Sequence, residues 1–381
     1  MREIPFGKPI VGDEEREAVM QVLRGTQYVH GPVAKAFEAD FSAFAGGGYA
    51  TSVASCTAAL HLCYFDLGIS QGDEVIVPAQ THVATAHAVE LMGGTCVFVD
   101  ADPKTGNIDV AAAAEAVTER TKAISVVHYL GLPADMDAIN AIAKNHNLFV
   151  VEDCALAMGS RYRGVQCGLL GDAGCFSFYP VKHITTAEGG MVISRHEDFI
   201  RRLERKKAFG VDRTVGERAV PGVYDVTMLG YNYRMNEIEA AVGREQMKRI
   251  YGFLKKRSEN AAALRRGLAQ IAEVELLSAG GGEFEHSNYC VAAILDDATA
   301  PRRYEIIANL KAMGVGTSVY YPAAVPHMKY YRDKYNAPVG SFPYASRISN
   351  QSIALSVGPH LDGDDMEYTV KSLKTAIEET A

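Results

Sequence analysis

The sequence lacks the features of an exported or membrane-inserted chain. No apolar run approaches the roughly 20 residues that a helix needs to span a bilayer, and the start, M-R-E-I-P-F-G, has no apolar signal-peptide core. The seven cysteines are an odd number, and none stands in C-x-x-C spacing. Four of them lie among apolar or small residues, as buried reduced thiols do: Cys56, Cys96, Cys154 and Cys175. We therefore expect a cytoplasmic protein.

Several ligand-binding motifs are also missing. The chain has no G-x-x-x-x-G-K-[ST] and no strand-borne G-x-G-x-x-G, which excludes the P-loop and Rossmann dinucleotide sites. None of the eleven histidines falls in an H-x-x-x-H group, so we predict no metal site. The net charge is −8, so we expect no binding to nucleic acid or to a membrane surface.

The chain has 381 residues, and 48% of them are hydrophobic, as in an ordinary soluble protein. This length suits about two domains, and the order of the predicted elements indicates an α/β fold. Strand-like and helical segments alternate, and the strands are nearly all apolar, which predicts a mostly parallel sheet with both faces covered. The expected strands are 50–54, 74–77, 95–99, 123–127 and 148–152, and the helices between them are 57–67, 83–92, 110–117 and 136–144. Ligands of such sheets bind at the carboxyl ends of the strands.

The last third of the chain has a different pattern. A helix over 236–266 is long enough to connect two domains, and a long loop over 214–230 precedes it. After it we expect a smaller α+β unit, with strands at 274–277, 289–295 and 315–320 and helices at 302–313 and 364–380. The predicted domains are residues 1–245 and residues 246–381, with the N-terminal segment packing on the smaller one.

One stretch, from Gly171 to Ile193, carries the most chemistry. A strand-like piece over 175–179 ends at Pro180, which cannot donate a ladder hydrogen bond, and Lys182 follows. Hydroxyls and glycines over 185–190 could surround an anion beside an amine nucleophile. Because most lysines are solvated surface charges, the spacing alone leaves the role of Lys182 open.

Three other places are candidates with ordinary alternatives. Asp153 closes an apolar strand, where a carboxylate must be paired, as a helix cap, an ion pair or a functional group. Ser55, Cys56 and Thr57 precede a helix, so they either cap it or offer its free N–H groups to a phosphate. His82 follows a strand and either stacks on an aromatic ligand or lies in a loop.

Together these stretches resemble the DegT/DnrJ/StrS family of sugar aminotransferases, which depend on pyridoxal 5'-phosphate (PLP) and have the aspartate-aminotransferase fold, fold type I. The resemblance covers nearly the whole chain and includes the pieces V-Y-Y-P at Val319 and F-P-Y-A-S at Phe342. Five blocks match in order: S-C-T-A-A-L-H-L, V-P-A-Q-T-H-V-A-T, V-E-D-C-A, G-D-A-G-C-F-S-F-Y-P-V-K-H-I-T-T-A-E-G-G and G-Y-N-Y-R-M-N-E-I-E-A-A.

The resemblance implies roles for the residues around the cofactor. Lys182 would bind PLP covalently and move the proton, and Asp153 would keep the pyridine nitrogen protonated. Cys56, Thr57 and Ser177 would hold the phosphate.

Further roles rest on the same resemblance. His82 stands where the family has an aromatic ring stacked on the cofactor, and Asn232 would complete the phosphate site from the neighbouring subunit of a homodimer. The resemblance also points to His183, Glu188 and Tyr320 as substrate-binding residues.

One position departs from the family. Three residues after the aspartate, where the family has Gln, His or Glu near the phenolic oxygen of the cofactor, this chain has Leu156.

The implied reaction transfers an amino group from L-glutamate, which becomes 2-oxoglutarate, to a keto-sugar linked to a nucleotide. The H-x-x-G-x-P-x-D-M-D run at His128 is similar to perosamine-synthase-like 4-aminotransferases, which suggests a 4-keto-6-deoxyhexose for glycan synthesis. The open alternatives are C-3 or aminocyclitol transamination, dehydration of the sugar, and a non-catalytic regulatory homologue.

Overall fold

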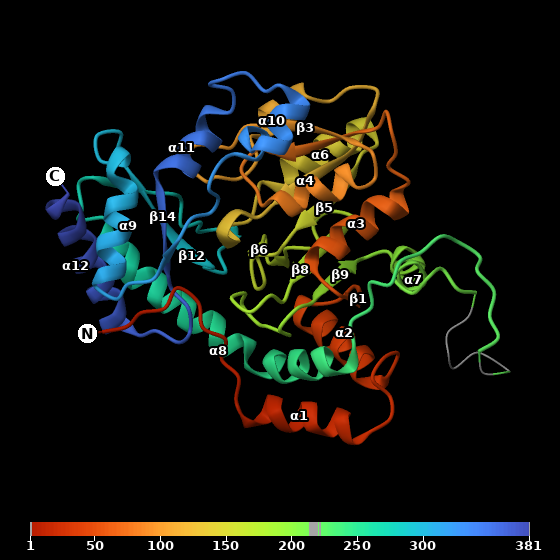
Figure 1. The fold of residues 1–381 in the computed structure, drawn as a ribbon. Helices are drawn as coiled ribbons and strands as arrows, with labels where there is room; N and C mark the ends of the chain where they lie inside the picture. Colours follow the sequence, from red (N-terminus) through yellow and green to blue (C-terminus); the bar gives the residue numbers. More distant parts are fainter. Residues whose placement is uncertain (1, 213–219, 221, 381) are drawn as a thin grey trace.

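A seven-stranded sheet forms the centre of the computed structural model, which describes residues 2–212, 220 and 222–380 (Figure 1). All neighbouring strands are parallel except where β9 meets β1 and β8. The expected α/β fold with a mostly parallel sheet is confirmed. In spatial order the strands are β1 (Tyr49–Val53), β9 (Gly190–Ser194), β8 (Ala173–Ser177), β5 (Phe149–Asp153), β4 (Thr121–Val127), β2 (Glu74–Pro78) and β3 (Thr95–Val99).

Helices cover both faces of this sheet because strand side chains alternate between the faces. Val75 and Val77 of β2 pack in the cluster that includes α3 and α4, whereas Ile76 packs with α5 and α6 on the other face. No described helix is both long and apolar enough to cross a membrane. The helices up to this point are α1 (Asp13–Arg24), α2 (Pro32–Ala45), α3 (Cys56–Leu67), α4 (Val83–Glu90), α5 (Val110–Glu115), α6 (Met136–His146), α7 (Glu197–Lys206) and α8 (Glu237–Leu268).

A second, antiparallel sheet lies beside the C-terminal half of α8 (Figure 1). The N-terminal segment joins it, since Ile4 pairs with Val315 and is buried in the same apolar cluster. The sheet runs β10 (Val274–Leu276), β12 (Cys290–Leu295), β14 (Ser352–Ser356) and β13 (Thr317–Ser318), and the helices near it are α9 (Arg303–Ala312), α11 (Pro343–Gln351) and α12 (Gly363–Glu379). Helix α10 (Lys329–Tyr335) packs instead in the cluster of the large sheet, with α4 and β3. Short strands β6 (Arg161–Tyr162), β7 (Val165–Gln166) and β11 (Phe284–Glu285) form a third sheet.

Two expected strands are shorter than the sequence suggests. The strand expected over 175–179 ends at Ser177, because the chain turns beyond Phe178 and the Lys182 amide donates to the Tyr179 carbonyl at 3.0 Å. The strand expected over 315–320 is reduced to β13, because Gly316 donates its amide to the Ile4 carbonyl instead. Residues 214–219 and 221 of the expected long loop lie outside the described residues.

Two glycines of α8 give a matched pair of stability predictions. A Cβ at Gly243 would lie 2.6 Å from the buried Phe37 ring, whereas a Cβ at Gly252 meets nothing within 4 Å. Gly243→Ala should therefore destabilise the protein by about 1–2 kcal/mol through overpacking. Gly252→Ala should stabilise it by about 0.5–1 kcal/mol, the helix propensity that alanine gains over glycine. Thermal unfolding of both variants checks this prediction. Equal changes in melting temperature for the two variants would contradict the packing of α2 on α8.

Candidate active site

Asp153 ends β5 at the carboxyl edge of the parallel strands, where the alternation of elements places ligand sites. Its Oδ2 accepts a hydrogen bond from the Thr85 hydroxyl at 2.7 Å, and Oδ1 accepts from the Ala155 amide at 3.0 Å. The Thr85 hydroxyl in turn lies 2.7 Å from that of Thr81. Asp153 is only 6% exposed, so these donors supply the partners that a buried carboxylate requires.

Lys182 lies on the loop that joins β8 to the antiparallel β9. The loop folds back on Phe178, whose carbonyl accepts from the Thr186 amide at 3.0 Å and from the Thr185 hydroxyl at 3.0 Å. The Phe178 amide donates to the Gly189 carbonyl at 3.0 Å. These hydrogen bonds fix the loop that holds Lys182. They explain why threonines and glycines follow the lysine in the sequence.

The Lys182 amine is half-buried near Asp153. Its Nζ lies 5.1 Å from the centre of the Tyr289 ring. Burial lowers the pKa of Lys182, and the Cys56 thiol and the Asp153 carboxylate oppose this shift. A lower pKa increases the fraction of neutral amine, which is the nucleophilic form.

The amino end of α3 forms a concave site beside the lysine loop. Ser55 caps the helix by accepting from the Ala58 amide at 3.1 Å, which leaves the Cys56 and Thr57 amides at the helix start. A Cβ at Gly190 would lie 2.7 Å from the Cys56 amide nitrogen, so only glycine allows this close approach. Ser177 pairs with Gly190 across β8 and β9, which brings its hydroxyl to the same place.

Several predicted residues converge on Lys182 and Asp153. Burial raises the pKa of Cys56 and lowers the pKa of His82, and the nearby Asp153 charge acts to raise both. His82 caps α4 and lies edge-on to the Tyr321 ring at 5.5 Å. Tyr320 reaches the same region through its hydroxyl, which lies 2.7 Å from that of Tyr289.

His183 faces away from the strand edge. Its ring is buried, and Nε2 lies 3.2 Å from the Ser287 carbonyl. Burial, with help from the Arg257 charge, lowers the pKa of His183 well below its usual value, so its ring is neutral.

The structure does not bring Asn232 and Glu188 to this centre within one chain. Asn232 is exposed and pairs with Ala208 beside α7. Glu188 is exposed, and its charge acts on Glu239 at the start of α8. Thr186 is buried and donates to the Glu188 carbonyl, so it supports the loop.

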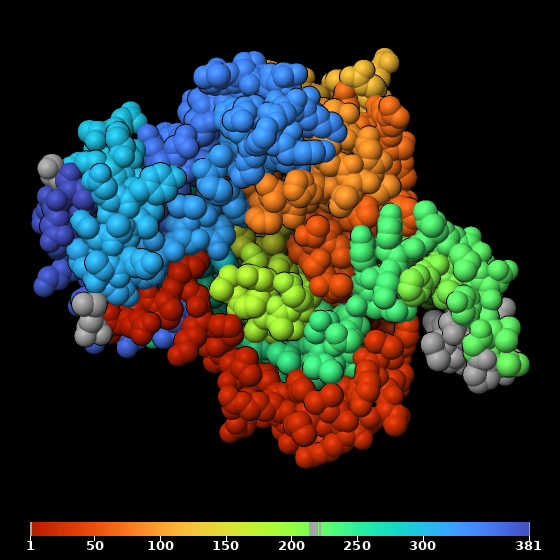
Figure 2. All heavy atoms as spheres, in the orientation of Figure 1, coloured from red at the N-terminus to blue at the C-terminus, as the bar shows by residue number. Residues whose placement is uncertain are grey.

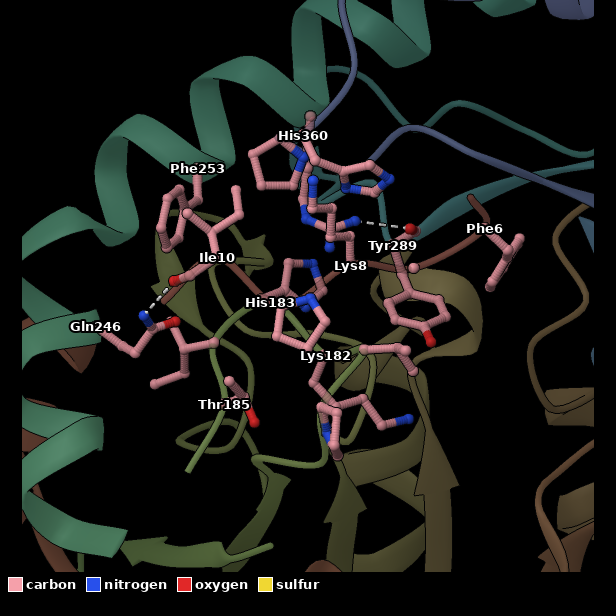
Figure 3. A pocket seen from close by; sticks show the side chains of 17 residues that line it. Phe6, Lys8, Ile10, Lys182, His183, Thr185, Gln246, Phe253, Tyr289 and His360 are labelled. Carbon is pink, nitrogen blue, oxygen red and sulfur yellow. Dashed lines mark hydrogen bonds between the residues drawn. The ribbon is translucent and has the colours of Figure 1, made fainter. Parts of the chain in front are cut away.

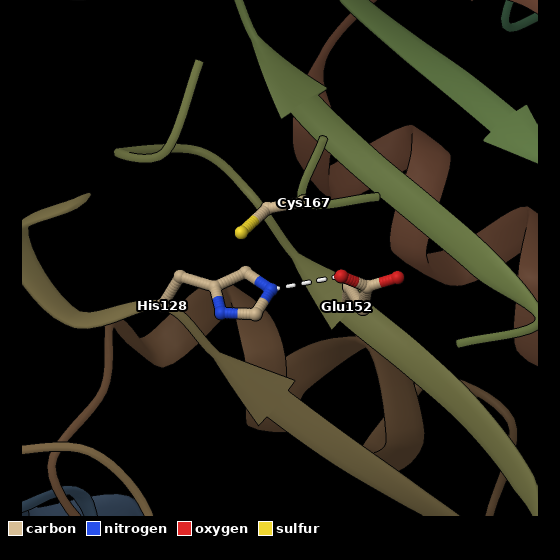
Figure 4. A group of neighbouring side chains, drawn as sticks. All are labelled: His128, Glu152 and Cys167. Atoms are coloured by element: carbon tan, nitrogen blue, oxygen red, sulfur yellow. Dashed lines mark hydrogen bonds and ion pairs between the residues drawn. The ribbon is translucent and has the colours of Figure 1, made fainter. Parts of the chain in front are cut away.

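One residue before Asp153 in β5, the carboxylate of Glu152 is buried, and Figure 4 shows it facing the His128 ring. Its two oxygens accept from the Gly168, Leu170 and Gly171 amides at 2.6–2.8 Å. His128 accepts from the Ala134 amide through Nδ1, so Nε2 carries the proton and donates to Glu152 at 2.9 Å.

Cys167 completes a group of side chains of metal-ligand type with His128 and Glu152. Both the carboxylate and the imidazole already have hydrogen-bond partners, and burial raises the pKa of the Cys167 thiol. We therefore interpret this group as structural support for the end of β5.

Two solved aminotransferases share the whole fold of this chain. Spr1654 of Streptococcus pneumoniae, assigned as a sugar aminotransferase and solved in PLP and PMP forms, matches in its PMP form with a TM-score of 0.94, 27% identity and full coverage of both chains. PseC of Helicobacter pylori, an aminotransferase of pseudoaminic acid biosynthesis, matches with a TM-score of 0.91 and 26% identity over 99% of this chain and 100% of its own.

The family assignment rests on sequence. The chain is 34% identical over 379 residues to the spore coat polysaccharide biosynthesis protein SpsC of Bacillus subtilis, covering 98% of this chain and 97% of SpsC. The profile of the DegT/DnrJ/EryC1/StrS aminotransferase family matches residues 9–374, and the chain belongs to that family. It is a PLP-dependent aminotransferase of fold type I.

The residues present fit this cofactor. The amides at the start of α3 and the close approach of Gly190 form the kind of cradle that holds a phosphate. Asp153 supplies a buried negative charge for a pyridinium nitrogen, and Lys182 supplies a half-buried amine nearby.

The sequence analysis missed two residues that the structure brings to the site. Thr85 lies in the V-P-A-Q-T-H-V-A-T block, three residues after His82, and its helical spacing could have indicated a shared face. Tyr289 lies just before β12, and no local signal predicts its contact with Lys182, which is more than 100 residues away in the chain.

The support role of Glu152 is testable. In Glu152→Gln the amide nitrogen cannot accept, so buried N–H donors lose their partner, and we expect a loss of about 2–4 kcal/mol of stability. Glu283→Gln, on an exposed ion pair with Arg163, is the matched control and should change stability by less than about 1 kcal/mol. Thermal unfolding of the cofactor-free proteins measures both, and a stable Glu152→Gln variant would refute the role.

Proposed function

We propose that the protein transfers an amino group from L-glutamate to a nucleotide-linked keto-sugar, with a 4-keto-6-deoxyhexose as the acceptor. The names of SpsC, a polysaccharide biosynthesis protein, and PseC, an aminotransferase of pseudoaminic acid biosynthesis, support a sugar as substrate. The H-x-x-G-x-P-x-D-M-D run at His128 supports a perosamine-type product. The observation that carries the proposal is the convergence of Lys182, Asp153 and the α3 amino end at one edge of the sheet.

PLP, when bound, carries the amino group and accepts electrons from the substrate carbon. In this proposal Lys182 is the catalytic base, because burial lowers its pKa and leaves more of the neutral amine to take a proton from that carbon. In the second half-reaction the same amine would deliver a proton to the carbon of the keto-sugar that receives the amino group. Asp153 stays in place through Thr85 and Ala155 and keeps the ring nitrogen protonated by its charge.

The remaining residues bind and orient. Cys56, Thr57 and Ser177 hold the phosphate group, and His82 covers the cofactor ring beside Tyr321. Tyr320 contributes to substrate binding, and its carbonyl accepts from the Gln80 side chain at 2.9 Å. Substrate-binding roles for His183 and Glu188 stay predictions, because within one chain the His183 ring is buried and Glu188 lies away from this centre.

We propose that two copies share their active sites, with Asn232 of each completing the phosphate site of the other. Asn232 is exposed, and the same region exposes large apolar side chains, among them Phe209 at 49% and Leu229 at 73%. Such apolar exposure is typical of a protein interface. The green segment around these residues projects from the body of the chain in Figure 2.

The domain division and the location are also proposals. A boundary at 245/246 falls within α8, whose C-terminal half packs in the cluster of the smaller sheet. We place the enzyme in the cytoplasm, because its seven cysteines are free thiols, even where Cys63 and Cys175 lie 3.7 Å apart.

The first prediction for this function concerns the two half-reactions. Glutamate should bleach the visible band of the lysine-bound cofactor, and GDP-4-keto-6-deoxymannose should restore it. If glutamate bleaches the band and only TDP- or UDP-linked ketones restore it, the nucleotide assignment is wrong. If glutamate does not bleach the band, the amino donor is wrong.

Substitutions then separate the two catalytic residues. Lys182→Ala should remove both the visible band and turnover, whereas Asp153→Asn should retain cofactor but lose activity on the order of 100-fold or more, because the amide carries no charge. Lys255→Ala, on the exposed face of α8, is the control and should behave as wild type. Normal turnover by Lys182→Ala would overturn the proposal. Analysis of the wild-type product distinguishes transamination from the alternative reaction, dehydration of the sugar.

A complementation experiment tests the shared sites. Lys182→Ala and Asn232→Ala should each have little activity alone. Mixing them by unfolding and refolding should restore activity, because in a mixed dimer one site combines the intact Lys182 of one copy with the intact Asn232 of the other. No recovery in mixed dimers isolated by two affinity tags would place both residues in sites built from one chain.

A further inference from the structure

A small cavity of about 20 Å³ lies behind the Lys182 loop, between the N-terminal segment and α8 (Figure 3). Residues 6–10 and 180–185 form two of its walls, and Arg257 reaches it from α8. Figure 3 shows Lys8 and His360 above His183 and Lys182 in that view. Three segments far apart in the sequence therefore enclose one space next to the reacting amine.

Arg257 carries a buried charge with no acidic partner. Its side chain is only 5% exposed, and Nη1 donates to the Tyr289 carbonyl at 2.8 Å. Its Nε makes no hydrogen bond, and no Asp or Glu of the described residues forms an ion pair with it. Burial lowers the pKa of Arg257 to about 10, so it remains charged at neutral pH. A buried unpaired charge costs several kcal/mol unless a counter-charge binds.

The other polar groups of the cavity are cationic or neutral, and no carboxylate side chain lines it. Lys8 is exposed at one wall, and the buried Nδ1 of His360 has no hydrogen-bond partner. Burial lowers the pKa of His360 and of His183, so both imidazoles are neutral, and the Nε2 of each donates to a backbone carbonyl, that of Pro5 at 3.0 Å and that of Ser287 at 3.2 Å. The cavity therefore has the positive charge of an anion site, and the Nε–H of Arg257 is its unused donor.

Its position selects the kind of anion. The Arg257 guanidinium lies 5.9 Å from the centre of the Tyr289 ring, and Lys182 Nζ lies 5.1 Å from the same centre. A small molecule whose amino group meets Lys182 can extend a carboxylate toward Arg257. Guanidinium groups bind planar carboxylates through paired hydrogen bonds, which Lys cannot reproduce.

We propose that Arg257 binds a carboxylate of the amino donor, and of the 2-oxo acid it becomes, and so selects an acidic amino acid as donor. This assignment rests on the proposed transamination, in which both substrates use the same Lys182. Arg257 would be a specificity-determining residue, and Lys8 would strengthen the positive field at the mouth of the cavity.

Arg265 offers a matched control on the same helix. Like Arg257, it donates to a backbone carbonyl, that of Leu277 at 2.7 Å, and its Nε is buried without a partner. It does not line the cavity. Arg265→Gln should therefore reproduce the structural cost of losing such an arginine without affecting an anion site.

The test is calorimetric titration of the PLP-loaded enzyme with glutarate, a five-carbon dicarboxylate without an amino group, and separately with GDP. Arg257→Gln should weaken glutarate binding at least tenfold and leave GDP binding within twofold of wild type. Arg257→Lys should recover only part of the loss, and Arg265→Gln should match wild type. In steady state, the KM for glutamate should rise more than kcat falls, with the KM for the sugar unchanged.

Two other outcomes would overturn the assignment of Arg257 to the donor carboxylate. Weaker binding of GDP with unchanged glutarate would show that the cavity takes the phosphate of the sugar nucleotide. Equal losses in Arg257→Gln and Arg265→Gln would show a structural role only. If wild type fails to aminate any keto-sugar, the proposed function fails, but glutarate binding that depends on Arg257 would still establish the carboxylate site.

Discussion

The alternation of side chains at the end of β5 is the constraint on which the active site depends. Glu152 and Asp153 are adjacent, so their carboxylates leave the strand on opposite sides. Glu152 accepts from three amides of the 168–171 loop and from His128, which fixes the chain that leads into β8. Asp153 faces Thr85 and the lysine loop. One carboxylate thus holds the framework, and its neighbour faces the reacting groups.

Burial determines the chemistry of the charged groups around this edge. It lowers the pKa of Lys182, while the nearby Asp153 charge limits the shift, so the amine is more reactive than a surface lysine. Asp153 has hydrogen-bond donors on both oxygens, whereas the buried Nε of Arg257 has no partner and no Asp or Glu of the described residues pairs with its charge. A buried charge without a counter-charge is costly, and Arg257 differs from Arg265 in that it also lines a cavity beside Lys182.

The substrate side of the site depends on contacts between distant parts of the chain. Gln80, two residues after β2, donates to the Tyr320 carbonyl and accepts from the Ser349 hydroxyl of α11 at 2.8 Å, which joins the large sheet to the segments around the smaller one. The N-terminal segment packs against the lysine loop, since a Cβ at Gly7 would lie 2.5 Å from Val181. Any movement between the two sheets would therefore alter the shape of the site as well as access to it.

The sequence by itself determined the strand–helix alternation, the fold class and the stretches that carry Lys182 and Asp153. These features are local, since periodicity, capping residues such as Ser55 and the glycines around the lysine loop act over a few residues. Only the tertiary structure decided the pairing of Glu152 with His128 and the meeting of Tyr289 and Arg257 beside Lys182. Those contacts join segments whose separation along the chain leaves no periodic signal, because burial and packing, rather than local backbone preference, bring them together.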